Sequence, residues 1–162
     1  MNIRLETEAD LLGIRAIEEQ AFSTRMEADL VDRLRADGDL VFSLVALVDD
    51  AIVGHAVFSR MRMPAATLGL GPVAVLTRHR RRGIAANLIR EGLRRAREEG
   101  WKGVFVVGNA DYYSRFGFDS ALAAGFASLY AGPHLLALAL QSDGLPSDAG
   151  SLEYPAAFAA LE

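Results

Sequence analysis

A run of arginines ahead of a glycine is the segment of this chain whose residue types best suit anion binding. Arg78 and Arg80–Arg82 precede Gly83, and helix-like sequence begins at Ile84. The N-terminus of a helix presents unpaired backbone N–H groups and the positive end of the helix dipole. A glycine followed by small residues lets oxyanions approach those N–H groups closely, and the arginines add positive charge. The segment therefore predicts a diphosphate site where a strand, a loop and a helix meet.

The distribution of charge supports a local anion site. The chain carries a net charge of −4, yet eight of its 17 basic residues lie between Arg78 and Arg97, and no Asp or Glu occurs between Ala51 and Arg90. A cationic segment in an acidic protein favours one polyanionic ligand over a surface built for nucleic acid. Sites for single-stranded nucleic acid need aromatic side chains on which bases stack, and no aromatic residue is interleaved among these arginines. We therefore expect no nucleic-acid partner.

Length and composition indicate one globular domain. The 162 residues, of which 51% are hydrophobic and 23% charged, are enough to bury a core, and we expect a single domain over residues 1–162. The chain has no cysteine, which excludes disulfides, thiolate nucleophiles and a thiolate-bound zinc site, and we expect no metal. No apolar run approaches the roughly 20 residues that span a bilayer, and the N-terminus does not resemble a signal peptide. We expect a cytoplasmic protein with no membrane partner.

Changes in apolar periodicity divide the chain into expected helices and strands. Helical spacing predicts helices that begin at Thr7 and Thr24 and end near Ala21 and Gly38, and a long helix over 84–99. Strands are expected at 41–48, 52–58, 67–75, 104–107 and 134–140, and a helical turn at 110–115. Because the long helix lies between two strands, those strands should be parallel. The order predicts an α+β, or α/β layered, domain with a mixed sheet.

Two motifs in this order resemble the landmarks of one family. Arg80-x-x-Gly83-x-Ala85 matches the Q/R-x-x-G-x-G/A signature of the GNAT (GCN5-related N-acetyltransferase) superfamily, and the preceding Pro72–Val75 resembles that family's strand. Tyr113–Phe118 resembles its second landmark, Y-x-K/R-x-G-F. The resemblance covers most of the chain and is closest to the YhbS-like N-acetyltransferases. It implies a GNAT-type fold, in which a mixed, mostly antiparallel central sheet carries helices on both faces.

The resemblance also implies acetyl-CoA as cofactor and assigns residues to it. The backbone of the strand that ends at Val75 would pair with the pantetheine arm, which gives this role to Val73 and Val75. The pyrophosphate would lie on the loop and the start of the helix. The residues expected there are Arg80, Arg81, Arg82, Gly83, Ile84, Ala85 and Ala86.

Tyr113 is the residue to which the resemblance assigns catalysis. It would act as general acid toward the leaving thiolate, because a thiol of reference pKa about 8.5 can be protonated by a phenol of about 10. A primary amine would attack the acyl carbon directly, and the absence of cysteine agrees with a reaction that has no covalent enzyme intermediate. A purely structural role for Tyr113 is the alternative, since Tyr112, Phe116 and Phe118 surround it in sequence.

The expected activity is therefore transfer of an acetyl group from acetyl-CoA to a primary amine. The acceptor is a small molecule or a peptide, and aminoglycosides, polyamines, amino acids and protein N-termini all remain open. A non-catalytic acyl-CoA sensor is the alternative function. The general base is open among His55, Glu27 and water, although Glu27 also fits a capping box that begins at Thr24. A homodimer is left open.

Overall fold

A computed structural model describes residues 1–161, in which six strands form one mixed sheet in the order β1-β2-β3-β4-β5-β7. The pairs β1–β2, β2–β3 and β5–β7 are antiparallel, and β4–β5 is parallel. The predicted mixed sheet and the parallel pair flanking the long helix are therefore confirmed. The strands are β1 (Asn2–Leu5), β2 (Leu40–Val48), β3 (Ala51–Arg60), β4 (Thr67–Val75), β5 (Gly103–Val107), β6 (Phe126–Ala127), β7 (Leu135–Ala139) and β8 (Gly150–Ser151).

The expected helices are present to within a few residues, whereas the short helices α5, η2 and η4 were not predicted. The α-helices are α1 (Leu11–Phe22), α2 (Met26–Ala36), α3 (Ile84–Glu98), α4 (Ala110–Tyr113) and α5 (Ser120–Ala123). The 3₁₀ helices are η1 (Glu8–Asp10), η2 (Thr77–His79), η3 (Ser114–Phe116) and η4 (Ala156–Leu161). The chain divides into two compact units. The first comprises residues 1–59, 71–92 and the segment from Ala156 onward; the second comprises 60–70 and 93–155.

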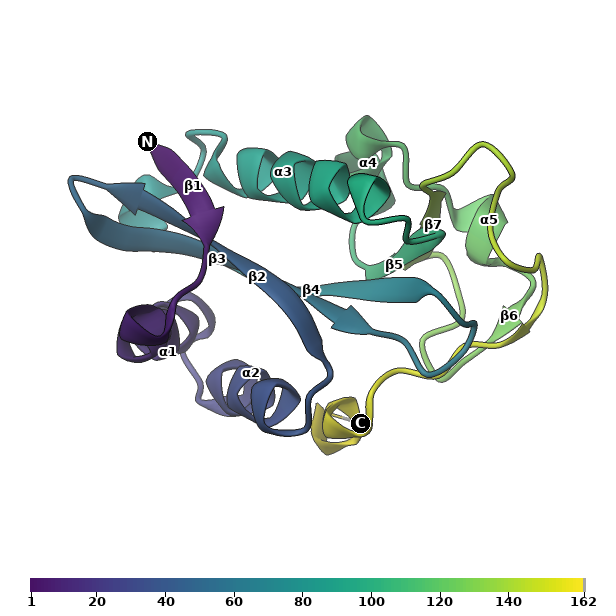
Figure 1. Ribbon diagram of the computed structural model, residues 1–162, viewed down its shortest axis with the longest axis horizontal. Helices are drawn as coiled ribbons and strands as arrows, with labels where there is room; N and C mark the ends of the chain where they lie inside the picture. The colour runs from purple at the N-terminus through teal and green to yellow at the C-terminus, as the bar shows by residue number, and fades with distance from the viewer. Residues whose placement is uncertain (162) are drawn as a thin grey trace. The chain divides into compact units, whose positions relative to one another are not determined.

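In the first unit, helices cover both faces of the strands β1 to β3. Figure 1 shows α1 and α2 on one face and the beginning of α3 on the other. A bulge in β3 turns nearby side chains of this strand toward opposite faces of the sheet. The pairing with β2 passes from Ala46↔Gly54 to Leu47↔Ile52 and leaves out Val53. Side chains on either side of the bulge then meet different helices. Ile52 lies against α1, whereas Gly54 lies against α3.

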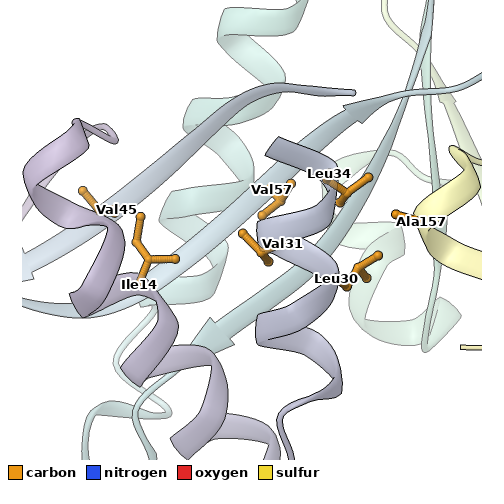
Figure 2. Close-up of a cluster of buried hydrophobic side chains, with 7 residues drawn as sticks. All are labelled: Ile14, Leu30, Val31, Leu34, Val45, Val57 and Ala157. Carbon is orange, nitrogen blue, oxygen red and sulfur yellow. The ribbon is translucent and has the colours of Figure 1, made fainter. Parts of the chain in front are cut away.

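The core of the first unit lies between the helices α1 and α2 and the sheet. Figure 2 shows Val45 and Val57 on the strands facing apolar side chains of both helices. The C-terminal η4 adds Ala157 to the same cluster. The buried members are Ile14, Leu30, Val31, Leu34, Val45, Val57 and Ala157.

The short strand β1 was not predicted from the sequence. Its four residues pair with β2 from Asn2↔Leu47 to Leu5↔Leu44, and only two of them are partly buried. Arg4 forms an ion pair with Asp10 at 2.7 Å, and Asp10 closes the capping box with Thr7 that begins η1. The predicted cap at Thr7 is therefore present, and it fastens β1 to the start of the first helix.

Glu6, just after β1, joins three elements through its carboxylate. It accepts hydrogen bonds from Arg35 Nε and Nη2 at 3.0 and 2.9 Å and from the Ser43 hydroxyl, and it lies 3.8 Å from His55 Nε2. Burial opposes its charge, but the nearby His55 and the hydrogen bonds from Arg35 and Ser43 outweigh this effect and lower the pKa of Glu6 to about 2. The ionised form of Glu6 therefore stabilises the folded state.

In the second unit, β5 lies between the start of β4 and β7. The pairs Thr67↔Gly103 to Gly69↔Phe105 are parallel, and Gly103↔Ala139 to Val107↔Leu135 are antiparallel. Phe105 packs edge-on against Phe126 with ring centroids 5.2 Å apart, inside a separate hydrophobic cluster. The small β6–β8 pair was not predicted, because two-residue strands leave no periodicity to detect.

Leu34→Ala should cost about 2–5 kcal/mol of unfolding free energy, because the side chain is fully buried (0% exposed) in the α1–α2 core and its loss leaves a cavity. Leu12→Ala is the matched control, since Leu12 is 85% exposed on α1 and should change stability by no more than about 0.5 kcal/mol. Urea unfolding measures both values. Equal losses would contradict the assignment of the core.

Glu6→Gln should lower the free energy of unfolding at neutral pH by at most about 3 kcal/mol, since the pKa of Glu6 falls from 4.5 to about 2 on folding. A carboxylate whose pKa is lower in the folded state stabilises that state at pH values above its pKa in the unfolded chain. The difference between wild type and variant should therefore be complete above pH 4.5 and disappear as the pH falls toward 2. Denaturant unfolding across this range checks it, with exposed Glu8→Gln as control. A difference that does not vary with pH would contradict the assignment.

Candidate functional site

The predicted anion-binding loop connects β4 to α3 within the first unit. It consists of η2 followed by Arg80–Gly83, and Arg81, Arg82 and Gly83 are exposed. Asn87 N–H bonds to Gly83 O at 3.0 Å and closes the first helical turn. The N–H groups of the three preceding residues, Ile84 to Ala86, therefore stand at the open end of a 15-residue helix, which is the arrangement that binds oxyanions.

Gly83 has the backbone conformation and the free space that such a site needs. Its φ of +77° is in the left-handed region that favours glycine, and a Cβ placed there would find no atom within 4 Å. Arg81 also has a positive φ, of 65°. The loop therefore turns sharply into the helix and leaves open space beside its N–H groups.

The beginning of α3 is positioned by close packing on β3. A Cβ at Gly54 would lie 2.9 Å from Ile84 Cγ2 and 3.1 Å from Leu88 Cδ1, so a larger residue there would force these side chains or the helix to shift. The end of β4 is joined to the same strand, because Leu76 N–H donates to Val53 O at 2.9 Å. The carbonyl of the bulge residue thus holds the strand end from which the loop departs.

Arg80 has a local structural task that its sequence position did not reveal. Its Nε donates to Val75 O at 3.3 Å and its Nη2 donates to Ala21 O at 3.0 Å. The side chain therefore bridges the end of β4 and the last turn of α1. Of the two strand residues expected at the pantetheine arm, Val73 is half-buried and Val75 is buried.

Tyr113 lies in the second unit, on a short helix that Asn109 caps. The Asn109 side chain accepts from the N–H groups of Asp111 and Tyr112 at 2.8 and 3.2 Å, so its role here is local. The Tyr113 ring contacts three aromatic rings, including Phe118 at 5.8 Å between centroids. Burial, and secondarily Tyr112, raise the pKa of Tyr113, which keeps the phenol protonated at neutral pH.

The Tyr113 hydroxyl makes no hydrogen bond to any residue between 1 and 161. Packing of the ring and availability of the hydroxyl are therefore compatible. The neighbouring Tyr112 differs, since its ring lies under the Arg115 guanidinium at 4.4 Å and its carbonyl accepts from Arg115 Nε.

His55, one of the candidate bases, is fully buried and bonded to a residue that the sequence did not single out. Its Nδ1 lies 2.8 Å from Glu18 Oε2, and both side chains are 0% exposed. Burial raises the pKa of Glu18. Burial also opposes the charge on His55, but the hydrogen bond with Glu18, the nearby Glu6 and the charges of both carboxylates together raise the pKa of His55. His55 therefore lies between the fully buried Glu18 and the half-buried Glu6, whose carboxylates favour its protonated form.

Glu18 had a signal in the sequence that could have found it. It follows Ile17 and lies one turn after Ile14, so it falls on the apolar face of α1. A charged residue at such a position is buried only with a partner. That partner is His55, on the strand that α1 covers.

The predicted capping box from Thr24 to Glu27 is wrong. The helix begins at Met26 with Arg25 at the N-cap, which makes no side-chain cap hydrogen bond. Thr24 Oγ1 accepts from Met26 N–H at 3.2 Å, so the turn is stabilised one residue earlier than a capping box requires. Glu27 consequently does not bond back to the cap, and its buried Oε1 has no hydrogen-bond partner.

Within residues 1–161, no group of three or more His, Cys, Asp or Glu side chains is arranged to hold a metal ion. Among these same residues, no helix combines the length and the apolar character needed to cross a membrane.

Known proteins that are similar to this chain in sequence and in structure are described as N-acetyltransferases or GNAT acetyltransferases. The uncharacterised N-acetyltransferase YhbS of Escherichia coli K12 is 38% identical over 125 residues, 75% of either chain. The structure of E. coli YhbS in complex with CoA has a TM-score of 0.90 at 33% identity, covering 98% of this chain and 91% of that one. A GNAT acetyltransferase of Brucella melitensis in complex with acetyl-CoA has a TM-score of 0.83 at 36% identity, covering 97% of both chains.

The family itself is identified by sequence. The sequence model of the acetyltransferase (GNAT) family matches residues 11–118, which span α1 to the second motif at Phe118. The match contains both landmarks, and the relatives share the whole fold at more than 30% identity. The chain therefore belongs to the acetyltransferase (GNAT) family and is an acyltransferase.

Proposed function

We propose that this enzyme transfers the acetyl group of acetyl-CoA to a primary amine, with Tyr113 as general acid. The observation that carries the proposal is the open N-terminus of α3 behind Gly83, where unpaired N–H groups, free space and exposed arginines occur together. The E. coli and B. melitensis relatives bind CoA and acetyl-CoA, which supports the same cofactor here.

The pyrophosphate is assigned to the loop and the first turn of α3. Backbone N–H groups from Arg81 to Ala86 would bind the phosphate oxygens, and the guanidinium groups of Arg81 and Arg82 would add charge. The Arg80 side chain is committed to Val75 O and Ala21 O, so it would act by holding the loop in place. The backbone at Val73 and Val75 would bind the pantetheine arm.

The chemistry needs an acid for the leaving group. The amine nitrogen attacks the thioester carbon, the C–S bond breaks, and the thiolate takes the proton of the Tyr113 phenol. Burial keeps that phenol protonated, and no described residue competes for its hydroxyl.

Residues 1–162 would form one acyl-CoA N-acyltransferase domain acting on a small-molecule or peptide amine. Its location in the cytoplasm and its assembly as a dimer remain predictions.

Gly83→Glu should weaken acetyl-CoA binding by at least about tenfold, or ~1.4 kcal/mol. A carboxylate beside the N–H groups repels the pyrophosphate, and the positive φ adds strain. Gly100→Glu is the matched control, because Gly100 has a φ of +87° and equally open surroundings at the other end of α3. Isothermal titration calorimetry measures both. Undiminished binding in Gly83→Glu would remove the proposed phosphate site.

Tyr113→Phe should lower kcat by about 10²-fold or more while the Kd for acetyl-CoA stays unchanged, because it removes only the acid. Tyr112→Phe should leave kcat near wild type. Both variants are measured by release of free CoA with spermidine, lysine, kanamycin and an alanyl peptide as acceptors. A kcat that survives Tyr113→Phe would assign the ring to packing. Acetyl-CoA binding without turnover of any amine would favour the acyl-CoA sensor.

A further inference from the structure

Gly108, the residue that follows β5 in the second unit, lies directly against the ring of Tyr113. A Cβ at this position would overlap Tyr113 Cε2 and would lie 2.9 Å from Cδ2 and 3.4 Å from Cζ, the carbon that carries the hydroxyl. The three atoms nearest to such a Cβ thus all belong to one phenol. The missing side chain of Gly108 therefore leaves the space that the hydroxyl end of the ring occupies.

The backbone conformation does not by itself require glycine at position 108. The φ of Gly108 lies outside the left-handed region, whereas Gly117, in the turn after Tyr113, has a φ of +98°. Alanine could therefore adopt the backbone conformation of Gly108, and the first atoms that its side chain would meet are those of Tyr113. Close approach of the ring, and not a turn, is the reason for a glycine here.

Gly108 has little room to retreat from the ring, because both of its main-chain polar groups meet His134. Its N–H donates to His134 O at 2.9 Å, which extends the β5–β7 pairing one step beyond Val107↔Leu135. His134 Nδ1 lies 3.3 Å from Gly108 O, where an Nδ1–H would donate to the carbonyl. The backbone beneath the phenol is therefore a continuation of the sheet.

The Tyr113 ring has equally little room on its other sides. Tyr112 and Phe118 pack edge-on against it, with ring centroids 5.1 and 5.8 Å away. Its own N–H donates to Asn109 O at 3.0 Å, which ties the tyrosine to the residue next to Gly108. Since no described residue forms a hydrogen bond with the hydroxyl, packing alone fixes where that hydroxyl lies.

We propose that Gly108 is a positioning residue for the acid, because the bare backbone at this point sets how far the Tyr113 hydroxyl reaches toward the leaving sulfur. This inference rests on the proposed function and adds the residue that directs its acid. A side chain at position 108 would displace the phenol and leave its chemistry intact. Misplacement of a catalytic group by about 1 Å can lower a rate by about 10²-fold, so even a methyl group should have a measurable effect.

Gly108→Ala should lower kcat by about tenfold or more, while the Kd for acetyl-CoA changes by less than about twofold. The acceptor is whichever of spermidine, lysine, kanamycin and an alanyl peptide wild type acetylates fastest. Gly103→Ala is the matched control, because Gly103 lies at the other end of β5 and a Cβ there would meet Leu145 and Leu138 O. It should lower the melting temperature but leave the kcat of the folded protein near the wild-type value.

A double variant separates positioning of the acid from a general disturbance of the fold. In Tyr113→Phe the phenol has no proton to deliver, so adding Gly108→Ala should lower kcat by no more than about a further twofold. A residue that only maintained the fold would cost the same factor in both backgrounds.

The NMR signal of tyrosine isotopically labelled at Cζ reports on the phenol without turnover. The signal of Tyr113 is identified among those of the four tyrosines by its loss in Tyr113→Phe. Addition of acetyl-CoA should shift this signal in wild type and in Gly103→Ala, and should shift it less in Gly108→Ala.

The outcomes distinguish this inference from the proposed function. An unchanged kcat in folded Gly108→Ala, when Tyr113→Phe loses activity, would overturn this inference alone. Equal losses in the two backgrounds would do the same, as would a Tyr113 signal that responds to acetyl-CoA equally in wild type and Gly108→Ala. A kcat that survives Tyr113→Phe, or wild type that acetylates none of the four amines, would instead overturn the proposed acid and this inference with it.

Discussion

The packing of the first turn of α3 on Gly54 is the constraint on which the first unit depends. Since a Cβ at position 54 would lie 2.9 Å from Ile84, the absence of a side chain fixes how closely the helix approaches β3. The same strand holds the end of β4 through Val53 O. The helix N-terminus and the strand end are therefore both positioned by two consecutive residues of β3, one bulged and one without a side chain.

Ionisable groups are buried on the other side of the same strand. Burial of Glu18 and His55 opposes the charge on each of them, and a well-packed apolar pair of similar volume is often at least as stable as an ion pair. The hydrogen bonds to Glu6 offset the cost of burying its charge and lower its pKa, whereas Glu18 and Glu27 each keep a buried oxygen without a hydrogen-bond partner. The distinction separates a carboxylate whose hydrogen bonds stabilise the fold from two that each keep a buried oxygen without a donor.

Much of this arrangement was readable in the sequence. Periodicity predicted β4 and α3 because both are long and strongly patterned, and the spacing from Arg80 to Ala85 predicted the loop. Periodicity did not reveal β1, because this strand is held by an ion pair between Arg4 and Asp10, which are six residues apart in the sequence. Nor did it reveal the task of Arg80, because its acceptor at Ala21 is 59 residues away. The local pattern from Thr24 to Glu27 fits a capping box, but this prediction was wrong because the helix begins at Met26, two residues after Thr24. Contacts between distant side chains leave no trace in local spacing.

The inclusion of η4 in the core of the first unit affects how the protein can fold during synthesis. Ala157 belongs to the same buried cluster as Ile14 and Leu34, although more than 120 residues separate it from either of them. Residues 1–59 therefore cannot complete their core when they leave the ribosome, because its last side chain is translated about a hundred residues later. The part of the α1–α2 surface that η4 covers stays exposed during this interval. Vectorial synthesis thus leaves this apolar patch in contact with solvent until translation reaches η4.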